Sequence, residues 1–396
     1  MSHRPAHLHF SQGTLWLMSL ASGASVANIA YNQPLLGSLA AYFHASPAQV
    51  GHVSVASQVG YGVGLLFFLP LGDLLERRRL VVGLMGACIL FLVAMACAPS
   101  LPLLVALQFC VAATAMSAQI LIPMAVEFSP PEDGGRVVGT LMTGVLGGLL
   151  LGRTIGGAVS DAFGWRAVFA MAAAFMAAVA VAIEFRLPRH APSREMAAMS
   201  YGRLMSSLWE VARGRPKLWT SSLVSALSFG SFTAFWTTLS FLMADRFHRG
   251  AAEAGLFGLV GLAGALAAPF FGRLADRIGS GRAVSLALVL GGVSFVLMGA
   301  WVTVPGLIVG VLLMDLGVQA VQVAEQAKIV ALLPSARSRL NTIYMVMRFG
   351  GGAAGSLVGA VAWSLWQWPG VCAVGIALNT LAMAVHAAGR EKRQAG

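Results

Sequence analysis

Long apolar segments alternate with short charged segments along the whole 396-residue chain. A helix needs about 20 mainly apolar residues to cross the hydrocarbon core of a bilayer. The first apolar segment is too long for a signal peptide, so we expect it to remain as a spanning helix. The pattern predicts twelve spans, at about residues 14–38, 49–71, 80–98, 101–124, 136–159, 167–186, 218–243, 254–272, 283–302, 305–332, 339–365 and 368–388.

The longest polar segment, residues 187–217, separates the sixth predicted span from the seventh. We expect it to be a cytoplasmic linker between an N-terminal six-helix bundle at residues 1–186 and a C-terminal six-helix bundle at residues 218–396. A helix on the inner membrane surface and a charged tether between the bundles are both compatible with its sequence. The apolar residues of the linker that follow helical spacing are Leu204, Leu208 and Val211.

The two predicted bundles contain related motifs. A glycine-rich charged segment at residues 272–282 has a degenerate copy at residues 72–79, and both bundles contain a ladder of glycines four residues apart. Internal duplication is common in membrane transporters, and small residues at this spacing let helices pack closely. The predicted packing residues of the first ladder are Gly148, Gly152, Gly156 and Gly157, and the second ladder consists of Gly351, Gly355 and Gly359.

The composition excludes a water-soluble fold. Hydrophobic residues make up 58% of the chain and charged residues only 10%, whereas soluble domains contain about 25% charged residues. The formal net charge is +11, but the basic residues are not interleaved with aromatic residues in a nucleic-acid-binding motif. We therefore expect no nucleic-acid partner. The four cysteines lie in apolar segments without metal-ligand spacing, so we expect no metal site.

The distribution of lysine and arginine predicts the orientation in the membrane, because cytoplasmic loops carry an excess of these residues. If the N-terminus is cytoplasmic, the loops and tails on that side contain 20 of the 26 lysines and arginines, and the opposite loops contain 3. We therefore expect both termini in the cytoplasm. The composition and the compact loops indicate a bacterial inner membrane.

The charged segments and the first glycine ladder resemble signatures of the major facilitator superfamily. The family's loop signature, Gly-x-Leu-Ala-Asp-Arg-x-Gly-Arg-Arg, is similar to residues 272–282, and its degenerate copy keeps Gly72 and Arg77. The family's antiporter-type signature, Gly-x-x-x-Gly-Pro-x-x-Gly-Gly, resembles residues 148–157, with Arg153 in place of the proline. The chain looks most similar to bacterial drug- and sugar-efflux members, including an arabinose-efflux-like subgroup.

This resemblance implies an all-α membrane protein, usually monomeric, with twelve transmembrane helices in two pseudo-symmetric six-helix bundles. In the charged segments, an acidic residue beside several arginines can hold helices together until a conformational change separates them. We expect such pairing at a cytoplasmic gate, between Glu76 and Arg77 and between Asp276 and its neighbouring arginines. Solvent-exposed charges that only set the orientation are the alternative. The candidate gate residues are Gly72, Glu76, Arg77, Gly272, Asp276, Arg277 and Arg282.

Ionisable residues inside a span are energetically costly and are therefore functional candidates. Asp315 lies about 15 Å into the tenth span at the helical rise, and it shares a helix face with Gln319 and Gln322. Because burial disfavours the charged form of a carboxyl group, we interpret Asp315 as the leading candidate for proton coupling. Arg153 or Arg348 would be its charge partner or a substrate contact. A fixed structural ion pair is the alternative.

Uncharged polar and aromatic residues within the spans are candidates for the wall of a substrate cavity. The family resemblance implies that the first, fourth, seventh and tenth spans line this cavity. Hydrogen bonds between helices or plain packing would account for the same residues. The candidates are Asn28, Tyr31, Asn32, Gln58, Tyr61, Gln108, Gln119, Phe232, Trp236, Gln319 and Gln322.

The sequence contains no catalytic triad, phosphate-binding loop or metal-ligand cluster, so we expect neither an enzyme nor a cofactor. Without a nucleotide site, the energy source should be an ion gradient. We expect an antiporter that couples protons to the efflux of a small drug- or sugar-like compound by alternating access. Proton-linked uptake of a nutrient and a non-transporting sensor or scaffold are the alternatives. The expected partners are a small-molecule substrate, protons and the lipid bilayer.

Overall fold

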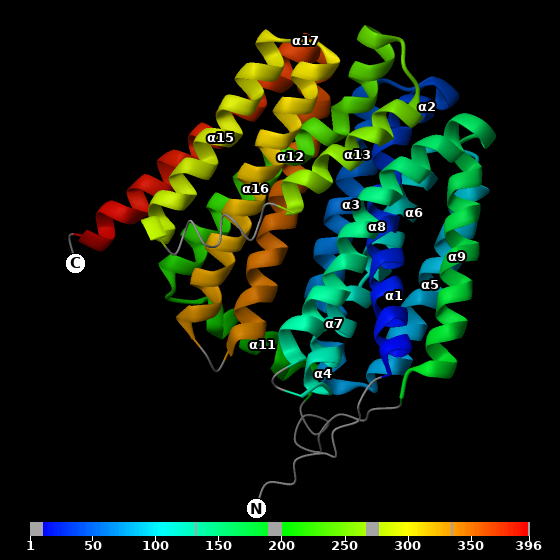
Figure 1. The fold of residues 1–396 in the computed structure, drawn as a ribbon, viewed down its shortest axis with the longest axis vertical. Helices are drawn as coiled ribbons and strands as arrows, with labels where there is room; N and C mark the ends of the chain where they lie inside the picture. Colours follow the sequence, from blue (N-terminus) through cyan, green and yellow to red (C-terminus); the bar gives the residue numbers. More distant parts are fainter. Residues whose placement is uncertain (1–10, 131–132, 189–199, 267–276, 334–335, 395–396) are drawn as a thin grey trace, which may run out of the picture.

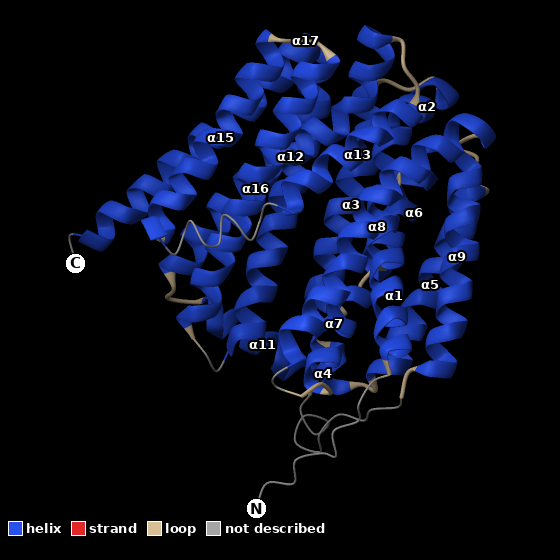
Figure 2. Ribbon diagram, viewed as in Figure 1, coloured by secondary structure: helices blue, strands red, loops and turns tan. Residues whose placement is uncertain are grey.

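The computed structural model describes residues 11–130, 133–188, 200–266, 277–333 and 336–394. These residues form helices joined by short loops and contain no β-strand (Figure 2). The helices are α1 (Gln12–Ala30), α2 (Asn32–Phe43), α3 (Pro47–Phe67), α4 (Leu71–Leu74), α5 (Arg77–Ala96), α6 (Leu101–Thr114), α7 (Ser117–Glu127), α8 (Gly134–Phe163), α9 (Trp165–Arg186), α11 (Tyr201–Ala212), α12 (Pro216–Phe247), α13 (Ala251–Leu266), α15 (Ser280–Ala300), α16 (Val304–Leu332) and α17 (Arg337–Gln394).

Nine helical segments in the described part of the chain are long and apolar enough to cross a bilayer. One of them, α17, covers the last two predicted spans, because Gln367 has a non-helical backbone (φ 53°, ψ −147°) between its two helical parts. The first predicted span corresponds to α1 and α2, and the eighth corresponds to α13 as far as the described residues reach. These helices confirm the predicted all-α membrane fold.

Two predicted spans are interrupted near their middle. In the first, Tyr31 separates α1 from α2, and in the fourth, residues 115–116 separate α6 from α7. The first break has a local cause, because Pro34 has no backbone N–H to donate to the carbonyl of Ala30. Each break places a polar residue that is a candidate for the cavity wall in the first turn of a helix inside the molecule. These residues are Asn32 of α2 and Gln119 of α7.

The helices form two groups, which we call the N-terminal group (α1 to α9) and the C-terminal group (α12 to α17) (Figure 1). Within the first group α1 packs on α8, α3 on α6 and α5 on α9, and within the second α12 packs on α17 and α15 on α16. The groups meet where α3 contacts α17 and where α8 contacts α13.

The glycine ladders lie at the closest helix contacts of each group. A Cβ atom at Gly148 of α8 would collide with the backbone carbonyl of Gly23 of α1. A Cβ atom at Gly351 of α17 would collide in the same way with the carbonyl of Ala226 of α12. Both members of the second contact lie 203 residues after those of the first. The duplication in the sequence is therefore also a duplication of helix packing.

Helix α11 occupies the middle of the linker. Its apolar side chains Leu204, Leu208 and Val211 are buried, and Val211 packs with Leu218 and Leu340 of the C-terminal group. The apolar face of this helix therefore contacts protein. A free tether would not bury these residues.

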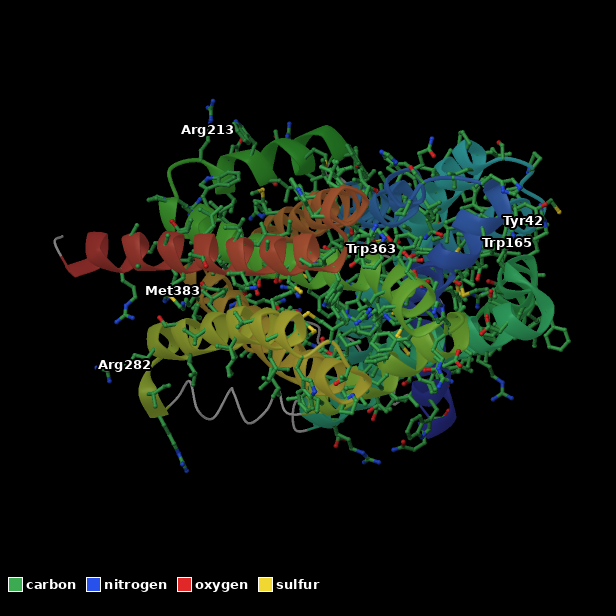
Figure 3. The ribbon with its side chains drawn as sticks, turned by 90° about the horizontal axis from the view of Figure 1, so that it is seen from above. Tyr42, Trp165, Arg213, Arg282, Trp363 and Met383 are labelled. Carbon is green, nitrogen blue, oxygen red and sulfur yellow. The ribbon has the colours of Figure 1, made fainter. Side chains whose placement is uncertain are left out.

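Apolar side chains on the outer helices face away from the protein. Leu90 of α5 is 72% exposed, Phe185 of α9 is 82% exposed and Val296 of α15 is 54% exposed. Such exposure is unfavourable in water and is expected where lipid is the solvent. The aromatic residues Tyr42 and Trp165, which are labelled in Figure 3, lie at one end of this surface with ring centroids 5.5 Å apart.

Candidate functional site

A buried arginine lies at the junction of the two helix groups. Arg153 extends from α8, and its side chain is almost fully buried. Its Nε atom donates a hydrogen bond of 2.6 Å to Oε1 of Gln33 on α2. The guanidinium carbon lies 4.0 Å from the ring centroid of Trp236 on α12. The charge-assisted hydrogen bond lies within the N-terminal group, and the cation–π contact links Arg153 to the C-terminal group.

Asp315 extends from α16 towards the same face of α13 that contacts Arg153. A Cβ atom at Gly261 of α13 would lie 2.6 Å from the Asp315 carboxylate, and one at Gly258 would lie 3.2 Å from Cβ of Arg153. The two charges interact electrostatically. Asp315 is buried and makes no hydrogen bond or ion pair with another described residue. The glycines of α13 thus leave room for Asp315 and Arg153 to lie near each other, but the two side chains do not form a salt bridge.

Arg348 lies in a different environment from this pair. Its Nη1 atom donates a hydrogen bond of 3.0 Å to Oγ of Ser225, and its guanidinium carbon lies 4.1 Å from the ring centroid of Phe229. Ser225 Oγ is 2.8 Å from the Tyr344 hydroxyl, which donates to the carbonyl of Gln322 at 3.3 Å. Of the two arginines predicted as possible partners, Arg153 is therefore the one that lies beside Asp315.

An aromatic row on α12 connects the surroundings of the two arginines. The ring centroids of Phe229 and Phe232 are 5.5 Å apart, and those of Phe232 and Trp236 are 6.0 Å apart. Arg153 lies over Trp236 at one end of the row, and Arg348 lies over Phe229 at the other. Spacing of three and four residues places these rings on one helix face. The sequence predicted Phe232 and Trp236, but it missed Phe229.

The aromatic row continues across the interface between the groups. Phe349 of α17 lies 5.4 Å from Phe229 and 4.5 Å from Tyr61 of α3, measured between ring centroids. Tyr61 also accepts a hydrogen bond of 3.1 Å from Nε2 of Gln119 on α7. Gln119 and Tyr61 therefore join helices, as the interhelical interpretation requires, and Tyr61 in addition faces the other group.

The N-terminal group contains several buried carboxamides with unused hydrogen-bonding atoms. Asn28 donates to Sγ of Cys88 at 3.6 Å, and Gln108 donates to Oγ of Ser57 at 3.2 Å. Buried polar atoms are normally paired, so the remaining atoms mark places where water or a ligand can bind. The carboxamide atoms without a partner among the described residues are Oδ1 of Asn28, both polar atoms of Asn32, Oε1 of Gln58 and Oε1 of Gln108.

The other cavity candidates are Tyr31, between α1 and α2, and Gln319 and Gln322, on α16. Tyr31 is buried at the break between α1 and α2, where a Cβ atom at Gly156 would lie 3.1 Å from its ring. Gln319 and Gln322 are half-buried on the same helix, α16, as Asp315. The continuous α16 keeps these three residues on one face.

The ion pairs of the degenerate charged segment, residues 72–79, differ from those that we expected. Arg77 bonds Glu127 at the end of α7 at 2.5 Å, and its Nε donates to the carbonyl of Gly72 at 3.3 Å. Glu76 instead pairs with Arg79 at 2.9 Å. The expected pair of Glu76 with Arg77 is wrong, because consecutive side chains at a helix start point about 100° apart. All these partners belong to the N-terminal group.

The second charged segment is only partly described. Gly272 and Asp276 lie outside the described residues. Arg277 and Arg282 are described and exposed, and Figure 3 shows Arg282 at the outer edge of the molecule.

A cleft opens between the groups at the end where α4 and α11 lie (Figure 1). Its volume is about 90 Å³. Arg77 and Gln119 line it from the N-terminal group, Arg339 lines it from the C-terminal group, and Leu204 and Leu208 of α11 lie between them. The Tyr201 hydroxyl donates to the carbonyl of Phe67 at 3.0 Å.

The opposite end of the molecule is closed. A Cβ atom at Gly37 of α2 would lie 3.4 Å from the Ser240 carbonyl oxygen of α12, and a Cβ atom at Gly51 of α3 would collide with the side chain of Ala360. Both carboxylate oxygens of Asp161 accept hydrogen bonds from the first backbone N–H groups of α13. A negative charge at a helix N-terminus is stabilising.

Comparisons with known proteins agree on one family. The sequence profile described as Major Facilitator Superfamily matches residues 15–256 and 221–395. The uncharacterized transporter YgaY of Escherichia coli O157:H7 is 37% identical over 396 residues, which covers 99% of each chain. Multidrug resistance protein MdtG of Proteus mirabilis is 31% identical over 163 residues, which covers 41% of this chain and 40% of that protein.

A solved structure has the same fold. A crystal structure of the nucleoside transporter NupG matches with a TM-score of 0.78 at 14% identity, covering 94% of this chain and 98% of that chain. At this identity the likeness supports the fold and says nothing about the substrate.

Proposed function

Because this chain belongs to the major facilitator superfamily, a family of membrane transporters, we propose that it exports a small organic compound in exchange for protons. It would do so by alternating access, in which two helix groups expose a shared site first to one side of the membrane and then to the other. We further propose that it works as a monomer in a bacterial inner membrane, with both termini in the cytoplasm.

The observation that carries this proposal is the central charged pair, which we define as Arg153 and Asp315. Asp315 is a buried carboxylate without a hydrogen-bond partner among the described residues, and its electrostatic partner Arg153 contacts both helix groups. Binding of a proton to Asp315 would remove one of the two charges. Arg153 would then lose an attraction towards α16 while keeping its contacts to Gln33 and Trp236.

This arrangement links protonation to movement of the groups in physical terms. A ligand shifts a conformational equilibrium only by its difference in affinity for the two states. A proton on Asp315 meets this condition if Arg153 lies at a different distance from the carboxylate in the two states. Because Arg153 contacts Gln33 of one group and Trp236 of the other, relative movement of the groups would change that distance.

The lining of the interface supports a substrate with a planar apolar part and polar substituents. The aromatic row on α12 offers ring faces, and the unpaired carboxamides of α1, α2, α3 and α6 offer hydrogen-bond donors and acceptors. Arg348 has no carboxylate within ion-pair distance among the described residues, so it is available to an acidic or strongly accepting group of the substrate.

The direction of transport and the conformational state of this structure are also part of the proposal. The partial similarity to a protein named for multidrug resistance supports export rather than uptake. The cleft that contains Arg77 and Arg339 would face the cytoplasm, in line with the excess of basic residues at this end. The structure would then represent the inward-facing state, with the end near Gly37 and Ser240 closed.

The proposal can be tested in everted membrane vesicles that carry an imposed proton gradient. A panel of small aromatic compounds should include at least one that accumulates only when the gradient is present. The Asp315→Asn variant should lose this accumulation, whereas the matched Asp245→Asn variant, which alters an exposed residue, should keep it. Gradient-driven accumulation that survives in Asp315→Asn would contradict the proton-coupling role, and accumulation only in right-side-out vesicles would indicate uptake.

A further inference from the structure

A second cavity lies at one end of the C-terminal group, away from the central charged pair. It is bounded by the first turns of α12 and α15, the last turns of α16 and the end of α17, and its volume is about 180 Å³. Its lining includes three basic side chains, which come from three different helices. These are Lys217 of α12, Lys328 of α16 and Arg390 of α17.

The single carboxylate among the described lining residues already forms an ion pair. Glu325 is almost fully buried and pairs with Lys328 at 2.8 Å, and Nδ1 of His386 lies 3.6 Å from the same carboxylate oxygen. The other ring nitrogen of His386 is 3.0 Å from the carbonyl oxygen of Gly281. The base of the cavity is therefore neutral through the pair of Glu325 with Lys328.

The two remaining cations have no such partner. Lys217 and Arg390 make no ion pair with another described residue, and both are exposed at the rim of the cavity. Small residues bring them to this position. A Cβ atom at Gly389 would lie 2.8 Å from the side chain of Thr220, so the glycine lets the end of α17 approach the start of α12. The rim therefore carries two positive charges that a bound anion would neutralise.

We propose that this cavity binds a phosphate group and that the phosphate belongs to the headgroup of an anionic phospholipid. Lysine and arginine bind phosphate through charge-assisted hydrogen bonds, and basic pockets between transmembrane helices at the membrane surface bind lipid headgroups. The position of the cavity at the ends of membrane-spanning helices fits a headgroup.

The outer surface below the cavity also fits a lipid. Leu286 of α15 is 41% exposed and Leu381 of α17 is 51% exposed. At the helical rise these residues lie about 7 Å and about 14 Å along their helices from Gly281 and Arg390 of the cavity wall. Acyl chains attached to a phosphate in the cavity can therefore lie on apolar side chains. A free phosphate ester would not use this surface.

The test uses the purified full-length chain in two arms. In the first arm the chain is placed in nanodiscs of phosphatidylcholine with or without phosphatidylglycerol, and retained lipid is counted by native mass spectrometry. In the second arm the chain in detergent is titrated with inorganic phosphate and with glycerol 3-phosphate. We expect phosphatidylglycerol to be retained over phosphatidylcholine, and neither soluble phosphate to compete with it at millimolar concentration.

Matched variants locate the binding. The double variant Lys217→Gln, Arg390→Gln should bind phosphatidylglycerol about 30-fold more weakly, since two basic residues near an anionic membrane each contribute about 1 kcal/mol and about 1.4 kcal/mol is a factor of ten. The control double variant Arg186→Gln, Arg203→Gln removes the same charge from two exposed side chains that do not line the cavity. The control should bind like the wild type, and the charge-preserving Lys217→Arg variant should also bind, which separates binding from a folding defect.

Three results would overturn the proposal. The first is equal retention of phosphatidylglycerol by the wild type and the Lys217→Gln, Arg390→Gln variant. The second is equal loss in the two double variants, which would indicate general surface charge. The third is competition by soluble phosphate that depends on Lys217 and Arg390, which would assign the cavity to a free phosphate ester rather than a lipid.

Discussion

Arg153 is held by contacts that a lysine at the same position could not reproduce. Its guanidinium group bonds Gln33 at 2.6 Å while its planar face lies over Trp236 at 4.0 Å. A lysine ammonium group is a compact charge without a planar face, so it cannot fill both roles at this distance. At the residue scale, the shape of the cation therefore matters as well as its charge.

The Arg153→Lys variant tests this point. We expect its rate of gradient-driven transport to fall by about tenfold or more, which corresponds to the loss of about 1–2 kcal/mol from a desolvated cation–π contact. The Arg246→Lys variant changes an exposed arginine of α12 and should leave the rate unchanged. Equal rates for Arg153→Lys and the wild type in everted vesicles would show that only the charge is needed.

The sequence selected Asp315 and Arg153 as candidates, but it did not show what lies around them. Asp315 and Arg153 are conspicuous because charges inside apolar spans are rare. Gly258 and Gly261, which let the two side chains pack against one face of α13, carry no chemical signal in a chain with 46 glycines. Ser225 and Tyr344 beside Arg348 were missed for the same reason, since their role depends on which helices are neighbours.

At the scale of helices, the glycine ladders set the distance between α1 and α8 and between α12 and α17. The contacts occur at residues that are related by the same offset of 203 positions in both groups. Close approach of this kind increases van der Waals contact, which replaces the hydrophobic effect as the main attraction between helices in lipid. We therefore expect that the ladder glycines cannot be replaced by residues with a side chain, whereas neighbouring glycines that face open space can.

Adjacent glycines of α8 offer a matched comparison. In Gly148→Ala the new methyl group collides with the backbone of Gly23, whereas in Gly147→Ala it enters open space. We expect Gly148→Ala to lower the free energy of unfolding by about 1–3 kcal/mol, as overpacking does, and Gly147→Ala to change it little. The measurement is the thermal unfolding midpoint in detergent, and equal midpoints would contradict the packing role of the ladder.

Helix α11 provides a second prediction at this scale. Leu208 is 6% exposed and lines the cleft between the groups, whereas the adjacent Trp209 is 57% exposed. We expect Leu208→Ala to destabilise the chain by about 2 kcal/mol or more through the cavity it leaves. Trp209→Ala should have a smaller effect. A larger loss of thermal stability in Trp209→Ala would show that the helix rests on the membrane by its other face.

The positions of the spans followed from hydropathy, but their interruptions did not. Where the ends of a predicted span are described, helix begins and ends within about five residues of them, because the length of an apolar segment is dictated by the bilayer. The breaks at Tyr31 and at residues 115–116 lie inside apolar segments. Pro34 offered a signal for the first break, whereas the second has no proline or glycine beside it.

At the scale of the whole molecule, one end is open and the other is closed. Alternating access requires the contacts at the closed end to separate during transport. A Cβ atom at Gly37 would lie 3.8 Å from Cβ of Ser240, which is within the range of about 3.5–4.5 Å found in disulfides. This geometry allows the closed end to be locked by a covalent bond.

We therefore expect a disulfide to form in the Gly37→Cys, Ser240→Cys double variant when Cys88, Cys97, Cys110 and Cys372 have been replaced by serine or alanine. Oxidation should abolish transport, and reduction should restore it. Each single cysteine variant should be insensitive to oxidation. Transport that continues with the disulfide intact, as verified by mass spectrometry of the cross-linked peptide, would mean that the closed end does not open.

The duplicated motifs were enough to predict a molecule of two related parts, because similar charged segments and glycine ladders recur in both halves of the chain. They did not reveal the conformation. Which end is closed depends on contacts between the groups, such as that of Gly51 with Ala360. Neither residue belongs to a recognisable motif, and the sequence is the same in every state of a transport cycle.

If protonation of Asp315 drives the movement of the two groups, a change of pH should move both ends of the molecule. Spin labels at Tyr42 and Asp245 would report the closed end, and labels at Leu75 and Ser338 would report the open end. All four residues are exposed, and the distances can be measured by double electron–electron resonance. Lowering the pH from about 8 to about 5 should change the two distances in opposite directions, since protonation removes a buried charge.

The Asp315→Asn variant should show the same two distances at both pH values, because it can no longer gain or lose the proton. The matched Glu210→Gln variant alters an exposed carboxylate of α11 and should respond like the wild type. Distances that respond to pH equally in Asp315→Asn and the wild type would contradict proton coupling through Asp315. Distances that change in the same direction at both ends would contradict alternating access.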